Sequence, residues 1–362
     1  MTGGDQPLAA AVVATVLNEG KHLSAWLMGL ESQTVHPSEV IIVDGGSQDD
    51  TLHQLRAWSP PFEVRIIAAP GTSISEGRNA AIAAVSSEVV AVTDAGTVAT
   101  SDWLERLIEP FAEPAVDVVA GGFRPVLDSR WQRALAAATL PDMEELSGAR
   151  ILPSSRSVAV RRRWLDMGYQ YPEWLDYCED LVWDLQLQRA GARFVFVPDA
   201  VVTFAPRASL AGYARQYFRY ARGDGRAGLW RQRHVVRYAT YAAMLFVIWR
   251  RKPLELVLAL VLGTGYAMPV VRRAWRRERV AGHPTGSFVK VAGAAILLRA
   301  CGDVAKMAGY PVGLAWRVRR YGPRASWRRI TPDGRLWRPG SRRTENRPPT
   351  MWRAGESRRA PR

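Results

Sequence analysis

Two adjacent carboxylates, Glu179 and Asp180, open a segment with recurring apolar residues that Gly191 closes in the manner of a helix C-cap. Acidic residues in a first helical turn interact favourably with the helix dipole, so the pair is compatible with an ordinary helix start. A carboxylate held there and aimed into a cleft can also act as a general base that takes a proton from a hydroxyl group. The two residues alone leave both interpretations open.

Further polar side chains follow three apolar runs that have the length of buried strands. Asn18 and Glu19 follow the first run, Asp44 ends the second and Asp94 follows the third. Asp and Asn are common turn formers and N-caps, so one such residue means little. Acidic residues at three strand ends are more than capping requires, and they indicate a ligand site. The runs are residues 8–17, 40–43 and 89–92.

The elements that must position these side chains alternate between strand and helix four times, with short connections. This pattern predicts an α/β fold with a mostly parallel sheet and helices on both faces. Ligands of such sheets bind at the carboxyl ends of the strands, where the polar residues stand. The first strand is not followed by Gly-x-Gly-x-x-Gly, which argues against a dinucleotide-binding domain.

The order of the motifs resembles that of the family 2 glycosyltransferases over about residues 8–225. Each motif has low specificity alone, and five in the right order make the resemblance specific. The motifs are Asp-Gly-Gly-Ser-Gln-Asp-Asp-Thr at 44–51, Gly-Arg-Asn-Ala-Ala at 77–81, Thr-Asp-Ala-Gly at 93–96, Glu-Asp at 179–180 and Gln-Tyr-Phe-Arg-Tyr at 216–220. The last is similar to the Gln-x-x-Arg-Trp box of membrane-bound polymerising members.

The resemblance implies a GT-A fold, which is Rossmann-like, and transfer of a sugar from a nucleotide diphosphate donor. It implies that Asp180 is the catalytic base and that Glu179 belongs to the same catalytic pair. The donor would be bound at the strand ends and on the basic, aromatic helix of residues 213–222. The implied nucleotide-sugar-binding residues are Asn18, Glu19, Asp44, Arg78, Asp94, Gln216 and Arg219.

The same resemblance implies a divalent cation, Mg²⁺ or Mn²⁺, with Asp94 as its protein ligand. Gly96 stands where the family usually has a metal-binding Asp, and a glycine has no side chain that can ligate. Water and pyrophosphate oxygens would complete the coordination of Mg²⁺. Nearby arginines would supply much of the missing positive charge as bidentate phosphate donors; they are Arg215, Arg219 and Arg222.

The sequence leaves the roles of two further residues, Arg156 and Trp174, undecided. Arg156, in a Pro-Ser-Ser loop, either faces the donor or is a solvated loop arginine. Trp174 can stack on a sugar face, but a core tryptophan is the favoured interpretation.

The composition of the chain limits the class of protein, its partners and its compartment. The chain of 362 residues can bury a full core, and its 48% hydrophobic residues are ordinary for a globular protein. The net charge of +15 indicates a polyanionic partner, such as nucleic acid, anionic lipid or a pyrophosphate substrate. No recognition-helix or RNA-binding signature is present, so nucleic acid is not expected as a partner. Cys178 and Cys301 are the only cysteines, which fits a reducing compartment and excludes a disulfide framework.

The composition changes after residue 230 and predicts three domains. Residues 1–230 would form the catalytic domain, residues 231–320 a membrane-associated helical region, and residues 321–362 a basic disordered tail. Residues 253–271 hold a single charge, Glu255, and are long enough to cross a bilayer. Residues 291–316 are a weaker candidate for a span, because charged residues lie within them. Basic clusters flank several apolar segments, so the positive-inside rule does not give one topology. The tail holds 12 arginines against three acidic residues.

The sequence therefore predicts an inverting glycosyltransferase at the cell membrane, with its catalytic domain in the cytosol. The expected partners are a nucleotide diphosphate sugar, a lipid-linked or polysaccharide acceptor, and membrane lipids. The alternative is a non-catalytic, glycosyltransferase-like membrane protein, which Gly96 suggests. The acidic pair and the basic helix favour the enzyme.

Overall fold

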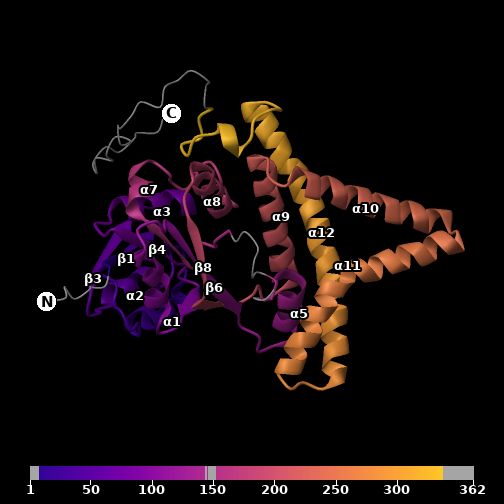
Figure 1. Ribbon diagram of the computed structural model, residues 1–362, viewed down its shortest axis with the longest axis horizontal. Coiled ribbons are helices and arrows are strands. Elements are labelled where there is room, and N and C mark those ends of the chain that lie inside the picture. Colours follow the sequence, from indigo (N-terminus) through magenta and orange to yellow (C-terminus); the bar gives the residue numbers. More distant parts are fainter. Residues whose placement is uncertain (1–7, 143–144, 146–151, 337–362) are drawn as a thin grey trace.

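The computed structural model describes residues 8–142, 145 and 152–336. An α/β part contains the N-terminal half of the chain, and a layer of long helices from the C-terminal half packs beside it (Figure 1). The strands form one sheet in the order β3-β2-β1-β4-β7-β6-β8-β5. They are β1 (Ala10–Val16), β2 (Glu39–Asp44), β3 (Glu63–Ala68), β4 (Val89–Val92), β5 (Thr97–Ala99), β6 (Val118–Pro125), β7 (Val158–Arg161) and β8 (Phe194–Phe204).

Strands β1, β2 and β4 are almost fully buried because helices cover both faces of the sheet. Successive side chains of a strand point to opposite faces, so Val12 and Val13 enter two different hydrophobic clusters. Helices α1, α2 and α4 complete the first cluster, and α3, α7 and α8 complete the second. These helices are α1 (Gly20–Glu31), α2 (Thr51–Ala57), α3 (Ile74–Ala83), α4 (Trp103–Ile108), α7 (Arg162–Asp166) and α8 (Glu179–Ala190).

The mostly parallel sheet is confirmed, with β1 parallel to both β2 and β4, and β2 parallel to β3. Two strands run against the rest: β7 is antiparallel to β4 and β6, and β5 is antiparallel to β8. Strand β8 is a single strand of 11 residues, although Pro198 and Asp199 interrupt its apolar sequence. The register of β8 against β6 shifts between Gly121 and Gly122, where Gly121 pairs with Val197 and Gly122 with Val201. The residues around Pro198 are therefore left out of the pairing, and the strand continues beyond them.

The remaining helices form the second layer, which packs against the α/β part through α9 (Figure 1). Tyr213 on α9 donates its hydroxyl to the carbonyl oxygen of Leu298 on α12 at 3.0 Å. Residues 291–316, a weak candidate for a membrane span in the sequence, lie in α12 and bury Val291 and Leu298 against α5 and α9. These helices are α5 (Arg130–Thr139), α9 (Leu210–Ala227), α10 (Arg231–Arg250), α11 (Pro253–Val280) and α12 (Thr285–Tyr321), with short 3₁₀ turns η1 (Glu109–Ala112) and η2 (Trp327–Arg329).

Helices α10 and α11 form a hairpin that extends away from the rest of the chain (Figure 1). Within the described residues, α11 is the one helix long and apolar enough to cross a membrane, and only 6% of its most apolar window is buried. Length and composition alone are weak support for a span. Large apolar side chains at the end of the hairpin are exposed, among them Leu245, Trp249, Leu254, Leu260 and Leu262.

The prediction of a disordered tail from residue 321 is wrong for its first part. Residues 322–336 follow α12, bury Trp327, and pair Ile330 with Leu336. The carbonyl oxygen of Thr331 accepts the indole N–H of Trp174 at 3.1 Å. The burial of Trp327 and the hydrogen bond to Thr331 hold this segment in place despite its basic composition. The rest of the predicted tail, residues 337–362, lies outside the described residues.

Candidate functional site

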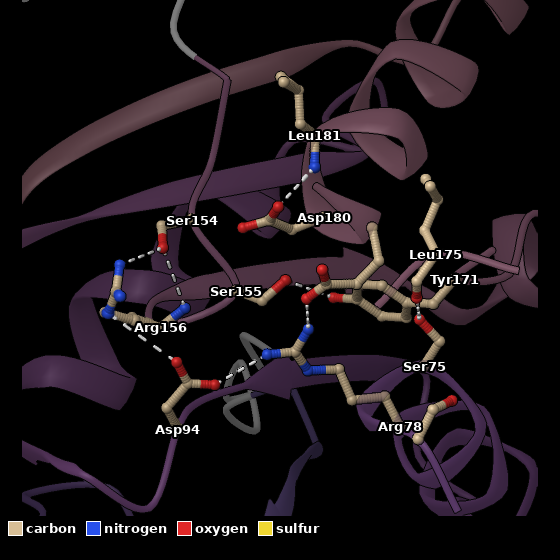
Figure 2. Close-up of polar contacts among 12 residues, drawn as sticks. Ser75, Arg78, Asp94, Ser154, Ser155, Arg156, Tyr171, Leu175, Asp180 and Leu181 are labelled. Atoms are coloured by element: carbon tan, nitrogen blue, oxygen red, sulfur yellow. Dashed lines mark hydrogen bonds and ion pairs between the residues drawn. The ribbon is translucent and has the colours of Figure 1, made fainter. Parts of the chain in front are cut away.

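A buried arginine joins two of the predicted motifs. Arg78 on α3 donates from Nη2 to Oδ1 of Asp94 and from Nη1 to Oε1 of Glu179, each at 2.8 Å (Figure 2). Its side chain is only 3% exposed. Asp94 follows β4 and Glu179 begins α8, so one guanidinium connects the carboxyl end of the sheet to the acidic pair. The sequence predicts a donor-binding role for Arg78, and the structure shows a side chain already engaged by protein carboxylates.

The local sequence explains why Arg78 reaches this position. Ser73 and Glu76 form a capping box that begins α3. A Cβ at Gly77 would lie 2.7 Å from Cγ2 of Thr15, so glycine is what lets α3 approach β1 this closely. Burial by itself would lower the pKa of Arg78, but Asp94 and Glu179 outweigh it and raise the pKa. The guanidinium is therefore a fixed positive charge.

The two members of the acidic pair differ in their surroundings. Glu179 is buried and holds Arg78, and burial, followed by the adjacent Asp180, raises its pKa despite the opposing effect of Arg78. Asp180 is half-buried, and its Oδ1 accepts the backbone N–H of Leu181 at 2.8 Å (Figure 2). Oδ2 of Asp180 has no ion-pair partner among the described residues. Asp180 is thus the carboxylate of the pair that is free to accept a proton.

Arg156 lies beside Asp94, and a role in donor binding stays a prediction. Its Nε lies 3.8 Å from Oδ2 of Asp94, and its Nη1 donates to Oγ of Ser154 at 3.2 Å (Figure 2). The guanidinium carbon lies 5.0 Å from the ring centroid of Phe204. The side chain is 28% exposed, so it is held by the protein and still accessible. A solvated loop arginine would lack these contacts.

The predicted nucleotide-sugar-binding residues Asn18 and Asp44 lie in neighbouring loops at the ends of β1 and β2. Both carboxylate oxygens of Asp44 accept hydrogen bonds from Ser47, and Oδ2 also accepts the backbone N–H of Gly46 at 3.1 Å. Asn18 accepts the backbone N–H of Gln48 at 2.8 Å through Oδ1. Asp44 is 1% exposed, so in this structure it shapes the turn. Contact of Asp44 and Asn18 with the nucleotide sugar stays a prediction.

Glu19 lies on the same side of the sheet as Asp94. Burial, with a smaller effect of Asp94, raises the pKa of Glu19 although His22 and Arg207 lower it. Oε2 of Glu19 lies 3.8 Å from the place where a Cβ at Gly96 would stand. Glu19 therefore faces the motif of Asp94, as predicted from the strand ends.

Helix α9 contributes aromatic and basic side chains. A Cβ at Gly223 would lie 2.5 Å from the carbonyl oxygen of Tyr177, so glycine allows α9 to pack against the residues that precede α8. Gln216 donates to the hydroxyl of Tyr220 at 2.7 Å. Arg219 is exposed and donates to the hydroxyl of Tyr177 at 2.8 Å. Arg219 thus contacts the segment that precedes the acidic pair, and Gln216 is held within α9.

The residues present do not form a protein cage for a divalent cation. Among the described residues, no group of three His, Cys, Asp or Glu side chains could hold a metal ion. Gly96 offers no ligand, Oδ1 of Asp94 is bound by Arg78 and Oδ2 faces Arg156. The predicted direct binding of a metal by Asp94 would have to displace these guanidinium contacts. This donor set does not fit the expected cation.

Trp174 is a packing residue, as the sequence favoured. Its ring stacks on that of Trp316 with a centroid separation of 6.5 Å and an interplanar angle of 8°. Asp184, one turn after Asp180, is 1% exposed, and burial raises its pKa well above the usual range. Asp184 is therefore a buried core residue rather than a second base.

Comparison with known proteins agrees with this geometry. The sequence model described as glycosyl transferase family 2 matches residues 11–165. Glycosyltransferase AglE of Haloferax volcanii is 25% identical over 244 residues, which cover 66% of this chain and 79% of that protein. The O-antigen chain rhamnosyltransferase RfbN of Salmonella typhimurium is 22% identical over 220 residues, which cover 56% of this chain and 69% of that protein.

A solved structure shows the same fold. The mannosyltransferase PcManGT from Pyrobaculum calidifontis, in complex with GDP-Man and Mn²⁺, superposes with a TM-score of 0.52 at 20% identity. The match covers 86% of this chain and 87% of that protein. It supports the GT-A-like arrangement of the sheet and its helices.

Proposed function

We propose that this chain, a glycosyltransferase with a family 2 domain at residues 11–165, transfers a sugar with inversion from a nucleotide diphosphate donor. The observation that carries the proposal is the pairing of a free carboxylate, Asp180, with a neighbouring carboxylate that is tied to Arg78. A general base must be able to reach the acceptor while the residues around it stay fixed. No arginine among the described residues holds Asp180, whereas the ion pair with Arg78 fixes Glu179.

The proposed reaction is a single displacement at the anomeric carbon. The acceptor hydroxyl oxygen forms a bond to that carbon, the bond from the carbon to the diphosphate oxygen breaks, and the nucleoside diphosphate leaves with the electron pair. Asp180 takes the proton of the acceptor hydroxyl. Glu179 acts as a positioning residue, because it fixes Arg78 and with it Asp94.

The donor would lie over the carboxyl ends of β1, β2 and β4, where ligands of such sheets bind. Asn18, Glu19 and Asp44 surround the end expected to hold the nucleoside, and Asp94 lies toward the acidic pair. Gln216 and Arg219 on α9 would face the diphosphate or the acceptor. No step of the proposed reaction passes through a metal ion, because the donor set does not fit one.

We further propose that the acceptor is lipid-linked or a growing glycan, and that the enzyme works at the cytosolic face of the cell membrane. Support comes from the exposed apolar side chains of α11 and from the length of that helix. The name of the relative RfbN, an O-antigen chain rhamnosyltransferase, is consistent with a glycan acceptor. The proposal puts the catalytic domain in the cytosol because nucleotide sugars are found there.

The stereochemistry of the product tests the reaction class. Purified full-length protein would be supplied with UDP- and GDP-sugars and a membrane lipid extract, and the anomeric configuration of the product would be read by NMR. Inversion relative to the donor is expected. Retention would contradict a single displacement assisted by Asp180, and loss of product in the Asp180→Asn variant would show that the product comes from this site.

A further inference from the structure

The carboxylate of Asp94 is occupied by arginines on both sides. Its Oδ1 accepts from Arg78 at 2.8 Å, and its Oδ2 lies 3.8 Å from Nε of Arg156. A divalent cation near Asp94 would have to compete with both guanidinium groups, and Gly96 adds no second oxygen. Positive charge is nevertheless needed here, because a diphosphate leaving group gains negative charge as its bond to the sugar breaks.

Arg156 is the arginine beside Asp94 that can meet this need. Arg78 is fully enclosed, and both of its Nη groups are bound by carboxylates. Arg222 and Arg226 are both paired with Asp176. Arg156 keeps an accessible edge and lies at Asp94, the residue of the donor-binding motif.

The surroundings of Arg156 hold its guanidinium in place without using all of its donors. Phe204 lies under the group, and Ser154 accepts one hydrogen bond. Oδ2 of Asp94 lies 3.8 Å from Nε, and Tyr220 also interacts with the guanidinium. An arginine has five N–H donors in a planar fork, so donors remain for two oxygens of one phosphate. Burial by itself would lower the pKa of Arg156, but Asp94 and Tyr220 outweigh it, and the pKa is raised.

We propose that Arg156 binds the diphosphate of the donor and neutralises its developing charge, so that the transfer needs no divalent cation. The inference rests on the proposed function and specifies how its leaving group is stabilised. The acceptor oxygen replaces the diphosphate oxygen on the anomeric carbon, Asp180 receives the acceptor proton, and the departing diphosphate keeps the electron pair beside Arg156.

The first test measures turnover of the full-length protein in EDTA and in added Mn²⁺ or Mg²⁺. Turnover in EDTA that stays within about two-fold of the value with metal supports the inference. Turnover that appears only with a metal overturns the inference and leaves the proposed glycosyl transfer standing. The two ideas can therefore fail separately.

The second test needs no acceptor and no turnover. Calorimetry in EDTA would compare the binding of UDP and GDP with that of UMP and GMP, for the parent and for Arg156→Ala. A charge-assisted hydrogen bond contributes about 1.5–3 kcal/mol, which corresponds to about a 10- to 100-fold weaker Kd. This loss is expected for the diphosphates and should be several-fold smaller for the monophosphates.

Two further variants separate charge from structure. Arg156→Lys keeps the positive charge and should recover part of the lost diphosphate affinity. Arg189→Ala removes an exposed arginine from the last turn of α8 and should bind as the parent does. Equal losses for diphosphate and monophosphate in Arg156→Ala would indicate a merely structural role and overturn the inference, as would unchanged diphosphate binding.

Discussion

Arg78 and Glu179 are 101 residues apart in the chain, and their side chains are joined at 2.8 Å in the interior. The contact links α3, which follows the third strand, to α8, which carries the proposed base. Because Arg78 also holds Asp94, the geometry of the donor end and that of the acceptor end depend on one buried side chain. The catalytic centre is therefore set by tertiary packing of the two halves of the α/β domain.

Replacement of Arg78 by Gln should destabilise the fold and abolish turnover. Removing one partner of a buried ion pair leaves uncompensated charge, which typically costs about 3–5 kcal/mol. Arg106→Gln is the matched control, because its pair with Asp102 is exposed and such pairs contribute little to stability. Thermal unfolding of the two variants measures the difference. Equal shifts in Tm would show that Arg78 has no special structural role.

The framework of this site could be predicted from the sequence, and its internal contacts could not. Runs of Val, Ile and Ala indicate buried strands by composition alone, so Asp44 and Asp94 could be assigned to the carboxyl ends of strands. The pattern contains no information about which distant carboxylate meets Arg78. It also cannot distinguish Arg156 from a solvated arginine, because Phe204 and Tyr220, which enclose it, come from other parts of the chain.

The same limit applies to the C-terminal half. Apolar composition made residues 291–316 resemble a weak membrane span, but α12 packs on α9 and α5. Arginine and proline content predicted disorder in residues 322–336, but Trp174 and Trp327 anchor that segment. In both cases a tertiary partner overrode the local signal, and hydropathy does not reveal such partners.

Arg219→Ala should weaken donor binding much more than it changes stability. Arg219 is exposed, and its hydrogen bond to the hydroxyl of Tyr177 contributes little to the fold. Loss of a charge-assisted contact to phosphate would reduce affinity about 10- to 100-fold. Calorimetry with UDP and GDP measures the change. Tyr177→Phe is the control for the protein–protein hydrogen bond, and an affinity loss as large in that variant would mean that Arg219 acts only through Tyr177.

The lowered pKa of Glu39 predicts that the stability of the fold depends on pH. Burial by itself would raise its pKa, but hydrogen bonds from Ser86 and Ser87, together with Arg65, outweigh it and lower the pKa from 4.5 to about 2. The folded state therefore favours the ionised form. Its contribution, about 3 kcal/mol by linkage, is present above about pH 4.5 and is lost as the pH falls toward 2.

The variant Glu39→Gln should lower Tm at pH 7, and the difference from the parent should shrink as the pH approaches 2. Glu63→Gln, an exposed position on the neighbouring strand, should show almost no difference at either pH. A Tm difference for Glu39→Gln that stays constant with pH would contradict the linkage.

The exposed apolar side chains of the hairpin formed by α10 and α11 predict membrane attachment. Leu258 and Leu262 are exposed on one face of α11. Replacing both by Asp should release the protein into the soluble fraction, since an acidic residue at the centre of a span costs roughly 2.5–3.5 kcal/mol for insertion. Met167→Asp changes an exposed apolar residue of the α/β part and should leave the distribution unchanged. Recovery of the parent in the soluble fraction without detergent would rule out an anchor in α11.

The assignment of the base is tested at Asp180. An inverting transfer is a single displacement, so the acceptor hydroxyl must lose its proton as it attacks, and a free carboxylate within reach can take it. Asp180→Asn preserves size and the hydrogen bond to the backbone N–H of Leu181 but removes basicity. Turnover should fall about 10²- to 10⁴-fold, the usual range for general base catalysis, with donor binding nearly intact.

Two neighbours of Asp180 serve as controls. One variant should leave turnover unchanged, and the other should lower both turnover and stability. Asp184→Asn replaces a carboxyl group buried in the core, whose pKa is raised by burial, so turnover should stay near that of the parent. Glu179→Gln weakens the ion pair with Arg78, so it should lower Tm as well as turnover. If Asp180→Asn retains near-parental turnover while Glu179→Gln is inactive at unchanged Tm, Glu179 is the base, because loss of activity without loss of stability cannot come from the broken pair.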